Sequence, residues 1–248
     1  MSSSQGVSVL VNGARGRMGQ EVVRAVREAP DLRLVGECDL GDDLERAIRS
    51  SGAQVVVDFT QPSAAVENTR TILEAGAHPV VGTTGFQRND IARLQERAER
   101  LSRGGLIAPN FAIGAVLLMR FAAQAARHLP DVEVIELHHD KKVDAPSGTA
   151  MKTIEMIHAS LPPDRAPPPE STEIVANARG GRYLGIAVHS VRLPGHVAHQ
   201  EVIFGGLGQT LTIRHDSIDR KSFMPGVVLA CRRVPALTRL HYGLETIL

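Results

Sequence analysis

The sequence predicts an α/β protein with a Rossmann-like doubly wound parallel sheet, joined to a second α+β domain with a mixed open sheet. Through the first two-fifths of the 248 residues, short apolar runs alternate with segments of helical spacing, which is typical of a parallel sheet with crossover helices. A glycine-rich turn follows the first apolar run. The later part has strand-like runs separated by glycine and proline turns, which favours a separate domain.

The composition limits the classes of function. Lys and Arg total 28 while Asp and Glu total 27, a net charge of +1, so neither nucleic acid nor a membrane is expected as a partner. The first residues lack a basic segment and an apolar run, and Cys38 and Cys231 have no metal-binding spacing. We therefore expect a cytoplasmic protein with no metal site.

Residues 7–11 are the first predicted strand, and a glycine loop and a helix with an apolar side of valines follow them. The glycines have the spacing G-x-x-G-x-x-G, which allows a tight turn and a close approach of the backbone to a pyrophosphate. A dinucleotide is therefore the expected cofactor of this domain. The loop residues expected to contact it are Gly13, Arg15, Gly16, Arg17 and Met18.

Asp39 lies just beyond the second predicted strand, residues 32–36. A carboxylate there can accept hydrogen bonds from the adenosine ribose hydroxyls, and the alternative is a turn residue in the run Asp-Leu-Gly-Asp-Asp. Asp39 would repel the 2′-phosphate of NADPH, whereas Arg15 and Arg17 could bind it. We therefore expect both NADH and NADPH to be used, with NADH at least as good.

The alternation continues with a helix at 44–49, a strand at 55–60, a helix that Ser63 could cap and that stops at Gly76, and a strand and turn at 79–85. An Arg- and Glu-rich helix and a fifth strand at 106–110 follow. Ligands bind at the carboxyl ends of parallel strands. We therefore expect the residues at two of these ends to lie beside the cofactor, with simple loops as the alternative: Gly82, Thr83, Thr84, Ala108, Pro109, Asn110 and Phe111.

The stretch 133–150, EVIELHHDKKVDAPSGTA, carries the densest group of titratable side chains. A strand at 132–137 ends at His138 and His139, and Ser147-Gly148-Thr149 precedes a segment of helical spacing. The first N–H groups of a helix bind carboxylates or phosphates. This combination suits a small acidic substrate that must accept a proton. The alternative is a solvated loop followed by an ordinary helix cap.

The remaining segments predict the frame of the second domain and the end of the chain. An apolar helix at 112–128 precedes the dense stretch, and a stiff proline-rich loop at 162–169 follows it. Runs at 183–193, 197–204 and 209–215 predict a three-stranded meander in an antiparallel or mixed sheet. Pro225 is compatible with the first turn of a final helix near 227–233.

Residues 133–150 resemble the signature of the dihydrodipicolinate reductase family, also called 4-hydroxy-tetrahydrodipicolinate reductases. The family pattern has Glu, two residues, Glu, one residue, His, three residues, Lys, one residue, Asp, one residue and Pro-Ser-Gly-Thr-Ala. Every place is filled by Glu133, Glu136, His138, Lys142, Asp144 and residues 146–150. The resemblance implies NADH- or NADPH-dependent reduction of 4-hydroxy-2,3,4,5-tetrahydrodipicolinate, a dicarboxylic acid of diaminopimelate and lysine biosynthesis.

Under this hypothesis His138 is the expected proton donor, and Lys142 assists by stabilising the developing charge. His139, Gly148 and Thr149 are expected to hold a substrate carboxylate. The resemblance further implies a homotetramer. It also implies a discontinuous dinucleotide-binding domain of residues 1–110 and 220–248, with residues 111–219 for substrate binding and oligomerisation. Leu40 and Gly41 follow Asp39 where family members carry an arginine, so no residue next to Asp39 neutralises the 2′-phosphate of NADPH.

Two other functions compete with this hypothesis. A two-domain dehydrogenase acting on aspartate or homoserine would share the glycine loop but should lack the His-His-x-x-Lys run. A catalytically idle dinucleotide-sensing protein would not require both His138 and Lys142. Both residues are present in this chain, which favours the reductase.

Overall fold

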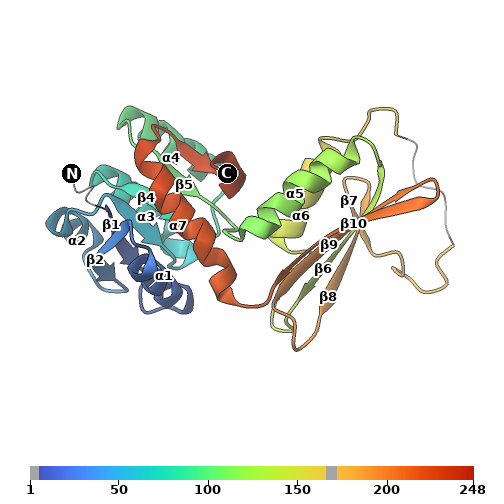
Figure 1. Ribbon diagram of the computed structural model, residues 1–248, viewed down its shortest axis with the longest axis horizontal. Helices are drawn as coiled ribbons and strands as arrows, with labels where there is room; N and C mark the ends of the chain where they lie inside the picture. The colour runs from blue at the N-terminus through green and yellow to red at the C-terminus, as the bar shows by residue number, and fades with distance from the viewer. Residues whose placement is uncertain (1–5, 166–171) are drawn as a thin grey trace. The chain divides into compact units, whose positions relative to one another are not determined.

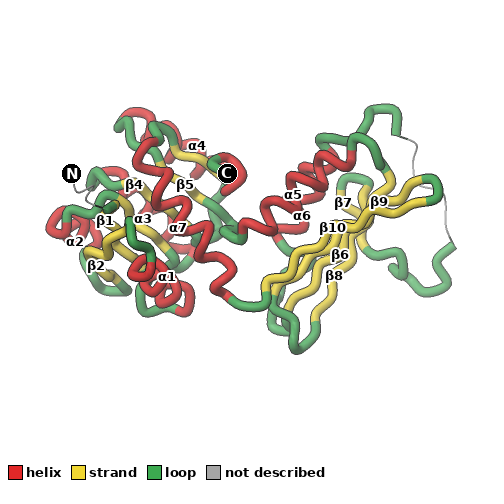
Figure 2. Tube along the Cα trace, viewed as in Figure 1, coloured by secondary structure: helices red, strands yellow, loops and turns green. Residues whose placement is uncertain are grey.

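The computed structural model describes residues 6–165 and 172–248, and the chain divides into two compact units. One unit comprises the chain up to Ile113 together with Arg220–Leu248, and the other comprises Gly114–Asp219. Figures 1 and 2 show the helices and strands of each unit. Residues 166–169 of the predicted proline-rich loop lie outside the described residues. Across the described ranges, no helix combines the length and apolar character that crossing a membrane requires.

The first unit is built on a six-stranded sheet with the order β11-β5-β4-β3-β1-β2, in which all neighbours are parallel. Because β1 pairs with both β2 and β3, the strand order reverses there, and such a reversal opens a ligand crevice at the carboxyl ends. The doubly wound parallel sheet is therefore confirmed. Its strands are β1 (Val7–Asn12), β2 (Leu32–Cys38), β3 (Val55–Asp58), β4 (His78–Val81), β5 (Gly105–Ile107) and β11 (Leu240–Tyr242).

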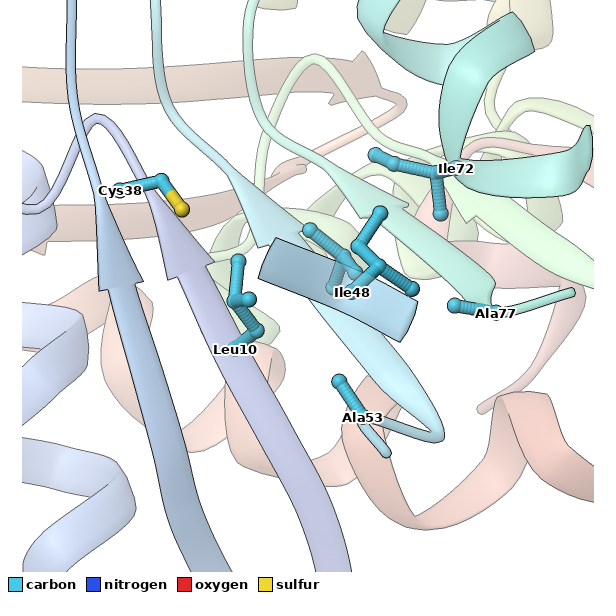
Figure 3. Close-up of a cluster of buried hydrophobic side chains, with 7 residues drawn as sticks. Leu10, Cys38, Ile48, Ala53, Ile72 and Ala77 are labelled. Atoms are coloured by element: carbon cyan, nitrogen blue, oxygen red, sulfur yellow. The ribbon is translucent and has the colours of Figure 1, made fainter. Parts of the chain in front are cut away.

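Helices cover both faces of this sheet. The helices α1 (Arg17–Glu28) and α7 (Met224–Arg233) contact each other and β1, whereas α2 (Leu44–Ser51) and α3 (Pro62–Glu74) form a second contacting pair. Figure 3 shows the apolar cluster beneath α2 and α3, with Leu10, Ile48 and Ile72 buried together. The remaining helix of this unit, α4 (Arg88–Arg100), packs on α3 and β11. Burial on both faces explains the continuous apolar runs of β3 and β4.

Three details of the first unit differ from the sequence-based expectations. Ser63 does not cap α3, because the helix begins at Pro62 and Gln61 is its N-cap; a proline suits the first helical position since its φ is already fixed. The strand β11 near the end of the chain was not predicted, and it pairs with β5 to extend the sheet. In addition, β5 ends at Ile107, so residues 108–110 lie in a loop.

The second unit contains a five-stranded mixed sheet with the order β10-β9-β6-β8-β7. The mixed sheet is confirmed, but the meander is wrong: β6 lies between β8 and β9, parallel to the first and antiparallel to the second. The predicted strand 183–193 is two strands, because Leu184 and Gly185 both have positive φ and turn the chain. The elements are α5 (Ile113–Ala126), β6 (Asp131–His138), α6 (Gly148–His158), β7 (Gly181–Tyr183), β8 (Ile186–Arg192), β9 (Ala198–Gly206) and β10 (Gln209–Ser217).

Side chains along β6 alternate between a buried and a half-buried face. Val132, Val134 and Glu136 are buried, whereas Glu133 and Ile135 between them are partly exposed, as the two-residue period of a strand requires. The buried face also includes the neighbouring positions of β9, where Gln200 donates to Thr153 of α6 at 2.7 Å. Glu136 is therefore a carboxylate in the interior of the unit, where an ionised group needs partners.

Candidate active site

The glycine loop between β1 and α1 requires its glycines for different reasons. Gly13 has a φ of +79°, and a Cβ on Gly13 or Gly19 would overlap backbone atoms of the neighbouring turn. Gly16 is instead the exposed N-cap of α1 and makes no side-chain cap. Since the first N–H groups of a helix have no intrahelical partners, this end fits an anionic pyrophosphate.

Asp39 joins the end of β2 to the glycine loop. Its carboxylate accepts hydrogen bonds from the backbone N–H of Leu40 at 2.8 Å and of Arg15 at 2.7 Å. These two bonds lower the pKa of Asp39 below its ordinary value. Its backbone carbonyl accepts from Asp42 N–H at 3.0 Å, so the alternative turn role has support. Each carboxylate oxygen keeps a second lone pair, which leaves capacity for a ribose hydroxyl.

Asp58 was not singled out from the sequence, yet it is fully buried at the end of β3. One carboxylate oxygen accepts from the amides of Asn12 at 2.7 Å and Asn68 at 2.9 Å. The other accepts from the hydroxyls of Thr60 and Thr83, each at 2.9 Å. The donors come from α3 and from the ends of β1, β3 and β4. One side chain therefore fixes the carboxyl ends of three adjacent strands.

Two further loops, residues 82–84 after β4 and 108–111 after β5, lie at the carboxyl ends of their strands. A Cβ on Gly82 would overlap the Phe59 ring, and the Phe111 ring lies 5.8 Å from Phe59 between centroids. Gly82 and Phe111 therefore have packing roles in addition to any contact with a cofactor. Among the other predicted residues, Thr84 and Pro109 are exposed, Asn110 is half-buried, and Thr83 and Ala108 are buried.

His138 is the last residue of β6, and its Nδ1 is hydrogen-bonded to Glu136 Oε2. Arg192 forms two bonds to the same carboxylate, from Nη2 to Oε1 at 2.7 Å and from Nη1 to Oε2 at 3.0 Å. Arg192 stands opposite His138 in the register of β6 and β8. The sheet pairing itself therefore brings these three side chains together.

Glu136 is ionised at neutral pH. Burial alone would raise its pKa, but hydrogen bonds from His138, Arg192 and Ser190 outweigh burial and lower the pKa to about 2. An ionised carboxylate only accepts hydrogen bonds, so Nδ1 of His138 carries the shared proton and Nε2 is the ring nitrogen left for a ligand. The role of Arg192 was missed, because nothing in its local sequence links it to a residue more than fifty positions earlier.

Lys142 lies in the loop after β6, with its Nζ 2.7 and 2.8 Å from the two carboxylate oxygens of Asp144. The hydrogen bond from Lys142 lowers the pKa of Asp144, so its carboxylate is ionised at neutral pH. Asp144 therefore lies where it can orient Lys142. His139 beside it is exposed.

The helix α6 begins at Gly148, and its N-cap Ser147 accepts a hydrogen bond from Ala150 N–H at 3.2 Å. The predicted helix start is confirmed. Gly148 is exposed, and a Cβ added to it would meet nothing within 4 Å, so neither packing nor backbone strain requires a glycine there. Thr149 is half-buried. This helix end, with its positive dipole, suits a carboxylate.

Comparison with known proteins assigns the chain to one family. The family models for the N-terminus and the C-terminus of dihydrodipicolinate reductase match residues 7–111 and 114–248. A 4-hydroxy-tetrahydrodipicolinate reductase of Streptococcus gordonii is 50% identical over 254 residues, covering 98% of this chain and 100% of that protein. One of Halalkalibacterium halodurans is 47% identical over 262 residues, covering 98% and 99%.

Solved structures agree with these matches. A dipicolinate-bound dihydrodipicolinate reductase from Paenisporosarcina sp. TG-14 superposes with a TM-score of 0.90 at 42% identity, covering 98% of this chain and 100% of that one. A probable dehydrogenase from Thermotoga maritima, with a TM-score of 0.66 and 10% identity over 96% and 91% of the two chains, shares only the fold. On the strength of both family models and these relatives, the chain belongs to the dihydrodipicolinate reductase family.

Proposed function

We propose that the chain reduces 4-hydroxy-2,3,4,5-tetrahydrodipicolinate to 2,3,4,5-tetrahydrodipicolinate with NADH or NADPH, in diaminopimelate and lysine biosynthesis. The observation that carries the proposal is the match of residues 7–111 and 114–248 to the two reductase models. The proposal includes a cytoplasmic location, whose reducing conditions suit the two buried free cysteines, Cys38 and Cys231.

The reaction adds one hydride and one proton to the substrate and releases one water. When bound, the dinucleotide supplies the hydride. His138 Nε2 gives a proton to the carbon that gains electron density, and Lys142 stabilises the negative charge that develops. The start of α6 at Gly148 and Thr149, with His139, holds a substrate carboxylate. The dipicolinate named with the Paenisporosarcina relative supports a dicarboxylate as the class of ligand.

The first unit supplies the dinucleotide site in this proposal. The exposed N-terminus of α1 binds the pyrophosphate, and Asp39 accepts from the adenosine ribose. The loops at 82–84 and 108–111 contact the nicotinamide half. The network around Asp58 supports this assignment, because it holds the ends of β1 and β4, from which two of these loops start.

The direct test is to add the product of the preceding synthase to the protein and NADH. Loss of NADH absorbance is the expected result. If the synthase product leaves the absorbance unchanged while NADH forms from NAD⁺ and homoserine, the chain is a dehydrogenase of the competing class. Tight binding of NADH without turnover of either substrate would identify a dinucleotide-sensing protein.

The preference between the two dinucleotides is a second prediction. Arg15 and Arg17 are exposed and can bind a 2′-phosphate, whereas Asp39 repels it. Wild-type specificity constants for NADH and NADPH should therefore lie within about two decades, with NADH at least as good, since about 1.4 kcal/mol corresponds to tenfold. Replacing both arginines by alanine should harm NADPH use more than NADH use. Equal losses would show that the arginines bind only the shared pyrophosphate.

A third prediction concerns the start of α6. Gly148→Ala should leave the fold as stable or more stable, by up to about 1 kcal/mol, because alanine favours helix and its Cβ has room. Inhibition by pyridine-2,6-dicarboxylate should nevertheless weaken at least about tenfold, because the methyl group blocks the carboxylate from the first N–H groups. Thermal unfolding and steady-state inhibition kinetics measure the two effects.

Gly16→Ala is the matched control, because it adds the same methyl group at the start of α1. It should weaken NADH binding and leave the inhibition constant of the dicarboxylate unchanged. The placement of the carboxylate at α6 is contradicted if Gly148→Ala leaves that inhibition constant unaltered.

We also propose a homotetramer formed through the sheet of the second unit. The face of this sheet that carries Ile135 and Ile203 is only half-buried in the single chain, and a partner subunit would complete its burial. Light scattering in solution should give four times the 26.7 kDa subunit mass. A mass equal to one subunit at micromolar concentration would contradict the proposal.

A further inference from the structure

We propose that Glu136 and Arg192 are positioning residues of the reaction, an inference that rests on the proposed role of His138. Glu136 holds the histidine so that Nε2 alone exchanges protons with the substrate. Arg192 links this pair to the loop that carries Lys142. The four side chains would thus act as one unit in which the proton donor and the cation keep a fixed geometry.

The first argument is that Glu136 is fully buried, between Ser190 of β8 and Gln200 of β9, at the end of an otherwise apolar face. The same face of the sheet carries Val132, Val134, Val202 and Phe204, all buried. An apolar residue at this position would give a comparable or more stable core, because burying an ion pair costs as much as it contributes. A buried Glu–Arg pair at the foot of the proposed proton donor therefore points to a role in the reaction and not in stability.

The second argument concerns the two ring nitrogens of His138. The ionised Glu136 cannot donate, so Nδ1 keeps its proton whether the ring is neutral or charged. The charged ring therefore gives its proton from Nε2 and remains the Nδ1–H tautomer afterwards. Beside this ring lie Glu136 on its own strand and, in the register of the sheet, Arg192 on β8, while β9 presents Ala198 opposite it.

The third argument concerns the other contacts of Arg192. Its Nη2 donates to the backbone carbonyl of Asp144 at 2.7 Å, and its Nη1 donates to that of Val191 at 2.8 Å. The side chain of Asp144 in turn holds Lys142. The planar guanidinium therefore connects the carboxylate beneath the proton donor to the residue that holds the lysine. A lysine at position 192 could not make all of these bonds at once.

The experiment starts with Glu136→Gln, which removes the charge and keeps the shape. We expect kcat to fall between tenfold and about a thousandfold, with unchanged NADH affinity. The alkaline limb of the kcat profile should move to lower pH, because Glu136→Gln removes the carboxylate that accepts the Nδ1 proton. A merely structural role would lower kcat by the same factor at every pH, and that result would overturn the proposal.

Glu133→Gln is the matched control on the same strand. Glu133 also pairs with an arginine and a histidine, Arg179 and His189, but it lies on the opposite, half-buried face. Because Glu133 lies on the face proposed to meet a partner subunit, the variant is compared after light scattering shows an unchanged mass, and it should then leave both the alkaline limb and kcat unchanged. If the alkaline limb of the kcat profile moves equally in the two variants, the proposal is overturned, because the shift would then come from the loss of any negative charge on the strand.

Arg192→Lys and Arg192→Met test the link to the loop, and they decide the question if Glu136→Gln does not fold. The lysine variant keeps a positive charge beside Glu136 but loses the hydrogen bond to the backbone carbonyl of Asp144. It should therefore retain most of kcat and its alkaline limb, with a raised KM for the substrate. The methionine variant should have a lower kcat in addition to the raised KM. Equal loss of kcat in the two variants would show that Arg192 acts only in packing.

A readout without turnover separates this proposal from the proposed function. Diethylpyrocarbonate modifies the neutral imidazole of His138, and peptide mass spectrometry follows its rate as a function of pH. The half-maximal rate should move to lower pH in Glu136→Gln even if the synthase product is not a substrate. An unmoved rate profile in a protein that does turn over the substrate would overturn the positioning role alone.

Discussion

His138→Ala should lower kcat by two to four decades, which corresponds to a loss of about 3 to 5 kcal/mol of transition-state stabilisation. The substrate carbon then has no proton donor, although the hydride donor and the carboxylate site remain. Lys142→Ala should lose a comparable amount. The affinity for NADH should barely change in either variant, since both residues lie in the second unit. Steady-state kinetics combined with NADH titration measure both quantities.

His189→Ala is the control for this experiment. His189 is a half-buried histidine on β8 and is bonded to Glu133 at 2.9 Å on the opposite face, so its loss should leave kcat near the wild-type value. Near-normal turnover in both His138→Ala and Lys142→Ala would contradict the assigned roles. The proton would then have to come from water or from a residue outside the signature.

Asp58→Ala should reduce the free energy of unfolding of the first unit by about 3 kcal/mol or more, because each buried donor left without an acceptor costs about 1 to 3 kcal/mol. Four side-chain donors and the backbone N–H of Thr60 lose their acceptor together. The glycine loop and the turn at Thr83 then lose their common anchor. NADH should therefore bind at least about tenfold more weakly, which is about 1.4 kcal/mol.

Thermal unfolding of the variant and NADH titration of its folded fraction test this prediction. Asp31→Ala is the control: Asp31 forms two bonds to Arg232, at 2.7 and 2.8 Å, but both side chains are exposed, and exposed ion pairs contribute little to stability. If Asp58→Ala were as mild as Asp31→Ala, the network would be dispensable for both the fold and the cofactor site.

The first six strands could be predicted because each is an apolar run bounded by glycine, proline or acidic residues, so local pattern and final structure agree. The strand order of the second sheet could not be predicted in this way. Placing β6 between β8 and β9 depends on pairing across some fifty to seventy residues, and alternating runs are equally compatible with a meander. Likewise β11 has three residues, LHY, which is too short to show any period.

The candidate site likewise divides into residues that local sequence indicates and residues that depend on strand pairing. His138, Lys142, Gly148 and Thr149 lie within one continuous stretch that resembles the family signature, so the resemblance could indicate them. Arg192 enters through strand register, which local sequence does not encode. Asp58 offered one signal, an acid that closes the apolar run VVVD. A carboxylate at the buried end of a strand requires donors, but their identity depends on which strands become neighbours.

The position of β11 at the edge of the first sheet has a consequence for synthesis of the chain. Its partner β5 leaves the ribosome early, but Leu240 pairs with Gly105 only after the whole of Gly114–Asp219 and α7 have been translated. Contacts of such sequence separation form late, since a long loop must close before they contribute. The nascent first unit therefore carries β5 as an unpaired edge, able to pair with other chains, while the continuous second unit can complete its own sheet.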